Sequence, residues 1–257
     1  MQVGFITYHR TLQFYQIVEG SAQPTQLIVA DIDDVFLPSP TDLLANLQNC
    51  KEQIANMLTD LPELFNGSPE TDSCLGAALQ AAYKMIYNTG GRITVVQSSL
   101  PNVGPGGLKS RDISGTNDKT ESALLNPSTD FYKKLALDCS GQQIAVDLFV
   151  LHNQHCDLAT ISGISKFSGG QVQTFAGFHS THNPSVAERF DRALRRYLTR
   201  KIGFEAVMRI RCTRGMSLHT FHGHFFVRST DLLSLPNVNP DSGFGMQVKV
   251  IFFLFKN

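Results

Sequence analysis

The sequence predicts an α/β domain with a mainly parallel sheet flanked by helices, followed by the start of an all-β domain. Two observations predict this fold class. Up to residue 201, short β-rich apolar runs alternate with stretches of helical periodicity. From residue 202 onward the period of the apolar residues changes from about 3.6 to about 2 residues, which is typical of strands. We therefore expect an α/β domain over residues 1–201 and a β domain over residues 202–257.

The first 65 residues predict three strands and a helix. Val3–Tyr8 and Leu12–Val18 are β-rich runs separated by a short polar turn, which indicates an antiparallel hairpin, and Leu27–Ala30 is a further apolar strand. Ser39 is a residue type favoured at a helix N-cap, and the proline that follows it is favoured at the first helical position. We expect a helix from there to Phe65.

The rest of the α/β domain alternates helices and strands. A second helix is expected from Thr71 to the glycine pair at residue 90, and residues 98–129, rich in Gly, Pro, Ser and Asn, predict a long surface loop. The Gly104–Gly107 turn lacks the Gly-Lys-Ser/Thr of a phosphate-binding loop, so we interpret it as flexible. The remaining predicted elements are strand Ile93–Val96, helix 130–139, strand Ile144–Leu151, helix Leu158–Ser165, strand Val172–Phe175 and helix Pro184–Lys201.

Period-2 runs predict three strands in the C-terminal segment, at Phe204–Cys212, Met216–Val227 and Met246–Phe255. Within the last run, Val248–Phe255 is nearly uncharged and contains no proline, which is the profile of an aggregating edge strand. We therefore expect poor solubility of the protein, and better solubility when residues 251–257 are deleted.

Composition excludes several classes of protein. The 22 basic and 22 acidic residues cancel, which argues against a nucleic-acid partner. No apolar run approaches the roughly 20 residues that span a bilayer, and the first residues do not form a signal peptide. An odd number of scattered cysteines without a Cys-x-x-Cys pair indicates buried thiols in a reducing compartment. We expect a cytosolic protein. The cysteines are Cys50, Cys74, Cys139, Cys156 and Cys212.

One motif suggests an enzyme. Asp31 and Asp33 follow a strand in an Asp-x-Asp pattern similar to the first motif of haloacid-dehalogenase phosphatases, where one carboxylate is the nucleophile and both help to hold magnesium. The lysine and the late acidic pair that this chemistry also needs do not follow at later strand ends. The alternative interpretation is that these aspartates form a polar loop before a helix. We favour this interpretation and predict no catalytic residue in the chain.

The histidines fall into three clusters, of which only His222 and His224 share one face of a predicted strand. No cysteine or carboxylate stands beside them at ligand spacing, so we predict no metal site.

Two groups of arginines remain as candidate binding residues. Arg189, Arg192 and Arg196 fall on one face of the predicted helix, which is either a solvated face or a surface for acidic lipid headgroups. Arg209 and Arg211 project from the same side of one strand. Such a pair binds carboxylates in a bidentate manner, and a solvated or internally paired sheet face is the alternative.

Long sequence segments spread over nearly the whole chain resemble the cargo-adaptor subunit of the COPII inner coat. They occur in family order, from residue 2 to about residue 250, with loop lengths similar to those of the family. The segments are Val3–Tyr8, Ile32–Pro38, Asp130–Ala136, Asp138–Gln143, Arg196–Cys212, Phe221–Gly223 and Phe225–Leu235.

The resemblance implies a von Willebrand factor A-like trunk domain followed by part of a β-sandwich. It implies a non-enzymatic adaptor on the cytosolic face of endoplasmic reticulum exit sites. Its partners would be the GTPase-activating inner-coat subunit, the cytosolic tails of cargo membrane proteins and an acidic membrane surface. Arg209 and Arg211 stand in the family's position for acidic export signals, whereas Asp31 lies in a trunk segment without a phosphatase role.

Three departures from the family pattern are expected. The first trunk strand and the preceding zinc ribbon, with its zinc, are missing, so we expect no cofactor in this chain. The later part of the sandwich and the domains that follow it are missing as well. Residues 251–257 differ from the family sequence.

Overall fold

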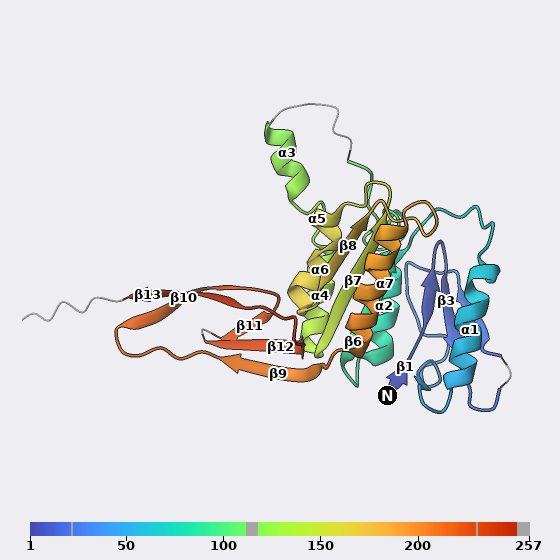
Figure 1. Cartoon of the computed structure of the whole chain (residues 1–257), viewed down its shortest axis with the longest axis horizontal. Helices are drawn as coiled ribbons and strands as arrows, with labels where there is room; N and C mark the ends of the chain where they lie inside the picture. The colour runs from blue at the N-terminus through green and yellow to red at the C-terminus, as the bar shows by residue number, and fades with distance from the viewer. Residues whose placement is uncertain (22, 112–117, 230, 251–257) are drawn as a thin grey trace, which may run out of the picture. The chain divides into compact units, whose positions relative to one another are not determined.

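The computed structural model describes residues 1–21, 23–111, 118–229 and 231–250, and the chain divides into two compact units (Figure 1). The chain passes between the units several times, so each unit is assembled from separate segments. The first unit consists of Met1–Tyr87, Ser99–Phe131 and Gln154–Asp157, and the second of Asn88–Ser98, Tyr132–Asn153 and Leu158–Asn257. The domain boundary expected after residue 201 stays a prediction.

The first unit contains two small antiparallel sheets, one of order β2-β3-β4 and one that pairs β1 with β5. The predicted hairpin and third strand are therefore confirmed. Leu12 and Phe14 on β3 are fully buried and pack in one core with Ala77 and Ala81. The strands are β1 (Gln2–Val3), β2 (Ile6–Tyr8), β3 (Leu12–Gln16), β4 (Thr25–Val29) and β5 (Ala45–Asn46), and the helices are α1 (Lys51–Leu64), α2 (Leu75–Ile86) and α3 (Asp118–Leu125).

The helix predicted from Ser39 begins only at Lys51, so that N-cap prediction is wrong. The Ser39 hydroxyl donates instead to the Asp42 carboxylate. Ala45 is buried and pairs with β1. The side-chain oxygen of Asn46 accepts hydrogen bonds from the backbone N–H groups of Gln48 and Asn49. Strand pairing and this side-chain turn together outweigh helix propensity between Ser39 and Lys51.

The region predicted as a long surface loop is partly packed. The backbone N–H of Ser73 donates to the side chain of Asn102, whose own N–H donates back to Ser73, so α2 begins later than the predicted Thr71. A Cβ on Gly76 would lie 1.8 Å from the carbonyl oxygen of Pro105. The Gly-rich turn is therefore seated against α2, which corrects its interpretation as flexible. Helix α3 also lies in the predicted loop, and residues 112–117 lie outside the described part.

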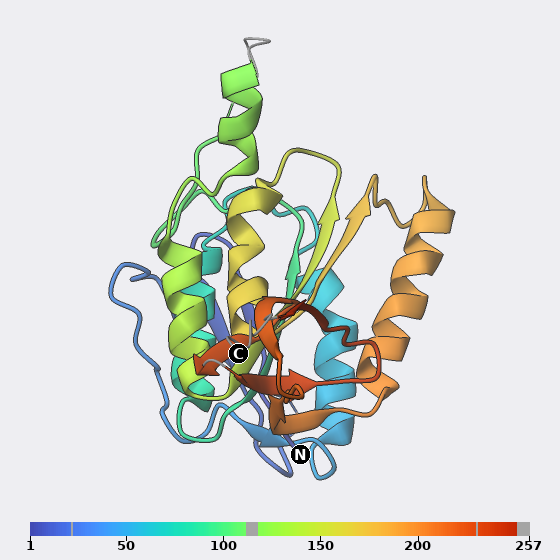
Figure 2. The ribbon, with the colours of Figure 1, turned by 90° about the vertical axis from the view of Figure 1, so that its left-hand side faces the viewer.

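The second unit is built on a parallel sheet of order β6-β7-β8. Figure 2 shows α4 and α6 on one face of this sheet and α7 on the other. The predicted parallel sheet flanked by helices is thus confirmed, although the helix predicted near residue 158 is two short helices. The elements are β6 (Gly91–Gln97), α4 (Phe131–Gly141), β7 (Ile144–His152), α5 (Leu158–Ile161), α6 (Gly163–Ser168), β8 (Val172–Ala176) and α7 (Pro184–Thr199).

Antiparallel strands complete the second unit, in a sheet of order β11-β12-β9 and a ribbon of β10 with β13. The run predicted as one strand from Met216 is two strands in different sheets. The first strand ends before Gly223, where φ is +144° and the backbone leaves the strand conformation. Asn237 on β12 donates from Nδ2 to the carbonyl of Gly91 at 2.9 Å, which ties this sheet to β6. The strands are β9 (Gly203–Arg209), β10 (Met216–His222), β11 (Phe226–Ser229), β12 (Leu232–Val238) and β13 (Gly245–Val250); the predicted extension to residue 255 lies outside the described residues.

Candidate functional site

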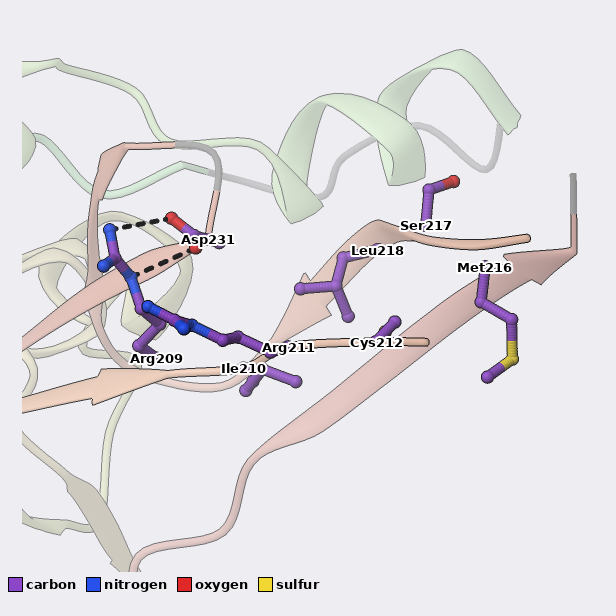
Figure 3. A pocket seen from close by; sticks show the side chains of 8 residues that line it. All are labelled: Arg209, Ile210, Arg211, Cys212, Met216, Ser217, Leu218 and Asp231. Atoms are coloured by element: carbon purple, nitrogen blue, oxygen red, sulfur yellow. Dashed lines mark hydrogen bonds and ion pairs between the residues drawn. The ribbon is translucent and has the colours of Figure 1, made fainter. Parts of the chain in front are cut away.

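Arg209 and Arg211 line one open depression of about 480 Å³ at the end of β9 (Figure 3). The strand predicted over Phe204–Cys212 ends at Arg209, and Arg211 follows in the segment that leads to β10. The prediction that both arginines project from one strand is therefore wrong for Arg211. Met216 and Leu218 of β10 supply apolar side chains to the same depression. The structure therefore brings the two predicted arginines to one surface, together with a small apolar wall.

Asp231 adds a carboxylate to the depression. The β9–β12 register places Leu232 opposite Arg209, so Asp231 lies beside Arg209 at the start of β12. Nε of Arg209 is 3.1 Å from Oδ2 of Asp231, and Nη2 is 3.4 Å from Oδ1. The side chains are 46% and 39% exposed, and a pair this exposed stabilises a fold very little.

Arg211 makes no ion pair within the described part of the chain. In Figure 3 its side chain extends toward the guanidinium of Arg209. Two guanidinium groups and one carboxylate thus line the depression, which keeps an excess positive charge. Because a guanidinium fork matches a carboxylate in shape, this arrangement can accept a further acidic group from outside.

The three arginines predicted on one face of α7 each have a partner in the second unit. Arg189 donates to the carbonyl of Thr174 and stacks over the Phe175 ring. Arg192 pairs at 3.9 Å with Glu188, one turn earlier.

Arg196, the third of them, donates from Nε to Asp241 at 3.0 Å, and Arg200 donates to the same carboxylate at 2.9 Å. The hydrogen bonds from Arg196 and Arg200 lower the pKa of Asp241 to about 2. Asp241 lies in the turn between β12 and β13, so Arg196 links α7 to that turn. The side chains of Arg192 and Arg196 are nevertheless 72% and 65% exposed.

The Asp-x-Asp motif forms a local turn. Oδ1 of Asp31 accepts the backbone N–H groups of Asp33 and Asp34 at 3.2 and 3.4 Å, and all three residues are exposed. The preceding strand β4 is an edge strand of an antiparallel sheet. The phosphatase motif belongs at the end of a parallel strand, so the polar-loop interpretation fits this structure better.

The histidines and cysteines give no cluster of metal ligands within the described residues. The prediction that His222 and His224 share a strand face is wrong, because β10 ends at His222 and the ring of His224 turns to the carbonyl of Gly170. The five cysteines are free thiols; four are buried as predicted, whereas Cys212 is half-buried and lines the depression. Burial raises the pKa of the Cys74 thiol to about 11.

Comparison with known proteins defines the class of this chain. The family model of the Sec23/Sec24 trunk domain matches residues 1–198, and the model of the Sec23/Sec24 beta-sandwich domain matches residues 203–252. An α/β trunk therefore precedes a β-sandwich segment, as the resemblance implied. The chain belongs to the Sec23/Sec24 family.

Relatives within the family are Sec24 proteins. The chain is 57% identical to human protein transport protein Sec24B over 250 residues, covering 97% of this chain and 20% of the relative. It is 56% identical to mouse Sec24A over 249 residues, covering 97% and 23%. The chain thus spans about a fifth of the length of these relatives.

A solved structure agrees with this assignment. The crystal structure of the human COPII-coat protein Sec24c matches with a TM-score of 0.89 at 33% identity, covering 97% of this chain and 33% of that one. The predicted fold class and the predicted family are both confirmed. Among the described helices, none is long and apolar enough to cross a bilayer.

Proposed function

We propose that this chain is part of a cargo-selecting adaptor of the COPII vesicle coat, which acts in transport from the endoplasmic reticulum to the Golgi. Membership of the Sec23/Sec24 family supports the proposal, as do the names of its relatives, which are protein transport and COPII-coat proteins. The proposed role is binding and assembly, with no catalytic residue and no cofactor in this chain.

The observation that carries the cargo assignment is the convergence of Arg209 and Arg211 on one open depression. The depression is accessible, holds an excess positive charge and has an apolar wall. A cytosolic cargo tail with an acidic export signal offers carboxylates that match the two guanidinium groups. Each charge-assisted hydrogen bond contributes roughly 1.5–3 kcal/mol when partly desolvated, and much less in open water.

Substitution of each arginine tests this assignment. In the full-length chain, Arg209→Ala or Arg211→Ala should weaken the binding of tails with acidic signals about tenfold, which corresponds to about 1.4 kcal/mol. Lysine at either position should restore binding only in part, because it loses the planar fork. Binding should also fall as salt is added. Fluorescence anisotropy with labelled tail peptides measures these affinities.

The matched control is Arg192→Ala, which removes one exposed arginine from α7 in the same unit. This variant should bind acidic tails like the wild type, and tails with hydrophobic signals should bind every variant equally. If all tails weaken together in the Arg209 and Arg211 variants, the arginines have a structural role and the cargo assignment fails.

The remaining parts of the proposal concern assembly. We propose that the chain pairs with the GTPase-activating inner-coat subunit and lies on the cytosolic face of endoplasmic reticulum exit sites. Co-precipitation of that subunit with the chain checks the pairing. A contact of Arg189, Arg192 and Arg196 with acidic headgroups also stays a prediction. Cosedimentation with vesicles that contain phosphatidylserine checks it, and equal binding to neutral vesicles would contradict it.

A further inference from the structure

The carboxylate of Asp231 occupies the place that an external carboxylate would take on Arg209. It contacts Nε and Nη2, which form one of the two hydrogen-bonding edges of the guanidinium. Both atoms lie in the depression that also holds Arg211 (Figure 3). Arg209 thus has its Nε/Nη2 edge occupied within the chain, whereas Arg211 makes no ion pair in the described part of the protein.

The exposed Arg209–Asp231 pair contributes little to the stability of the fold. Both partners are well exposed, and the longer of the two hydrogen bonds is 3.4 Å. Exposed pairs contribute little, so separation of the pair costs little. Asp231 immediately precedes β12, and the pairing of β12 with β9 begins at Leu232. The Asp231 carboxylate can therefore turn away from Arg209 without loss of strand pairing.

We propose that Asp231 is an internal competitor for the Nε/Nη2 edge of Arg209. An acidic signal must displace it to use that edge, while Arg211 is the open position where the signal first binds. This inference rests on the proposed function of the two arginines. It names Asp231 as a residue that sets the affinity and selectivity of the site. A partner whose carboxylates cannot displace Asp231 binds through Arg211 alone. The site therefore binds weakly acidic partners with lower affinity than strongly acidic ones.

A charge-removing substitution in the full-length chain tests the proposal. The probe is a labelled ten-residue Gly/Ser peptide with two aspartates separated by one residue, and its companion has two asparagines instead. Asp231→Asn should strengthen binding of the acidic peptide about two- to fivefold, which is the range expected for an exposed ion pair. Binding of the asparagine peptide should not change. Asp191→Asn is the matched control, because it removes the carboxylate of an exposed Arg–Asp pair on α7.

A double-mutant cycle separates competition from general repulsion. If Asp231 competes for Arg209, its removal gives no gain in an Arg209→Ala background, because the contested guanidinium is absent. A gain of equal size in that background would show through-space repulsion alone and would overturn the proposal. Weaker binding by Asp231→Asn would show that Asp231 orients Arg209, and unchanged binding would show no role; each overturns it as well.

The outcomes also distinguish this proposal from the proposed function. If Arg209→Ala and Arg211→Ala weaken acidic binding but Asp231→Asn does not strengthen it, only the competitor is wrong. If neither arginine substitution affects acidic binding, the cargo assignment itself is wrong, and the competitor falls with it. Asp231→Ser is a second variant in case Asp231→Asn fails to fold, and the same gain is expected from it.

Discussion

The hydroxyl of Tyr197 on α7 donates to Oδ2 of Asp147 on β7 at 2.8 Å, and both residues are buried in the second unit. Oδ1 of Asp147 accepts the backbone N–H of Gln171 at 2.7 Å, and the hydroxyl of Thr94 on β6 lies 2.7 Å from that of Tyr197. The buried Asp147 carboxylate therefore joins β7 to α7, and the Tyr197 hydroxyl extends this network to β6. Since α7 leads directly into β9, the same network fixes the helix that precedes Arg209.

Removal of the Tyr197 hydroxyl should destabilise the second unit. Tyr197→Phe keeps the ring and its packing against Phe149, but it leaves the buried Asp147 carboxylate with one hydrogen bond fewer. We expect a loss of about 1–3 kcal/mol in the free energy of unfolding, because a buried acceptor without its donor keeps its desolvation cost. Urea denaturation followed by circular dichroism measures the loss.

The exposed Tyr87 provides the control for this substitution. Tyr87→Phe removes a hydroxyl from a residue that is 45% exposed, so its effect should be within a few tenths of a kcal/mol. Equal stability of both variants and the wild type would show that the Tyr197–Asp147 hydrogen bond contributes nothing.

The stability of the second unit should depend on the charge of Asp147. Burial raises the pKa of this carboxyl above its ordinary value of 3.8, although the hydrogen bond from Tyr197 opposes the shift. The folded state therefore binds a proton more tightly than the unfolded state. Between the two pKa values the free energy of unfolding falls as the pH rises, and above the folded-state pKa the loss is complete.

Asp147→Asn tests this dependence, because it keeps an oxygen acceptor but removes the titration. The stability of this variant relative to the wild type should increase as the pH rises from about 4 and should then become constant, when urea unfolding is measured at several pH values. A relative stability that falls or stays flat with rising pH would contradict the assignment.

Elements with strong local patterns could be predicted from the sequence. Ile144–Leu151 is a nearly continuous apolar run, as expected for a central parallel strand covered by helices on both faces, and β7 lies there with most of its residues buried. The glycine pair at residue 90, predicted to end the second helix, lies between the end of α2 and the body of β6. The helical period of α7 was likewise found within two residues of its observed end.

Elements that depend on tertiary contacts could not be predicted. β12 was missed because most of its residues are buried, so the sequence has no period-2 alternation, and Pro236 argues against a strand. The same omission concealed part of the candidate site. The Arg-x-Arg spacing identifies Arg209 and Arg211 as a candidate pair, although Arg211 lies beyond the end of β9. Asp231 reaches Arg209 only through the β9–β12 register, which leaves no local signal in the sequence.

The close contact between α2 and the Gly-rich turn gives the last prediction. In most helices Gly→Ala stabilises by roughly 0.5–1 kcal/mol, because alanine loses less backbone entropy. At Gly76 the added Cβ would lie 1.8 Å from the carbonyl oxygen of Pro105, a backbone atom that cannot rotate away. Gly76→Ala should therefore destabilise the first unit by about 1–3 kcal/mol or more, as overpacking does. Gly141→Ala, where no atom lies within 4 Å of the added Cβ, is the control and should be neutral or slightly stabilising. Urea denaturation compares the two variants, and a stabilised Gly76→Ala protein would show that the turn does not pack on α2.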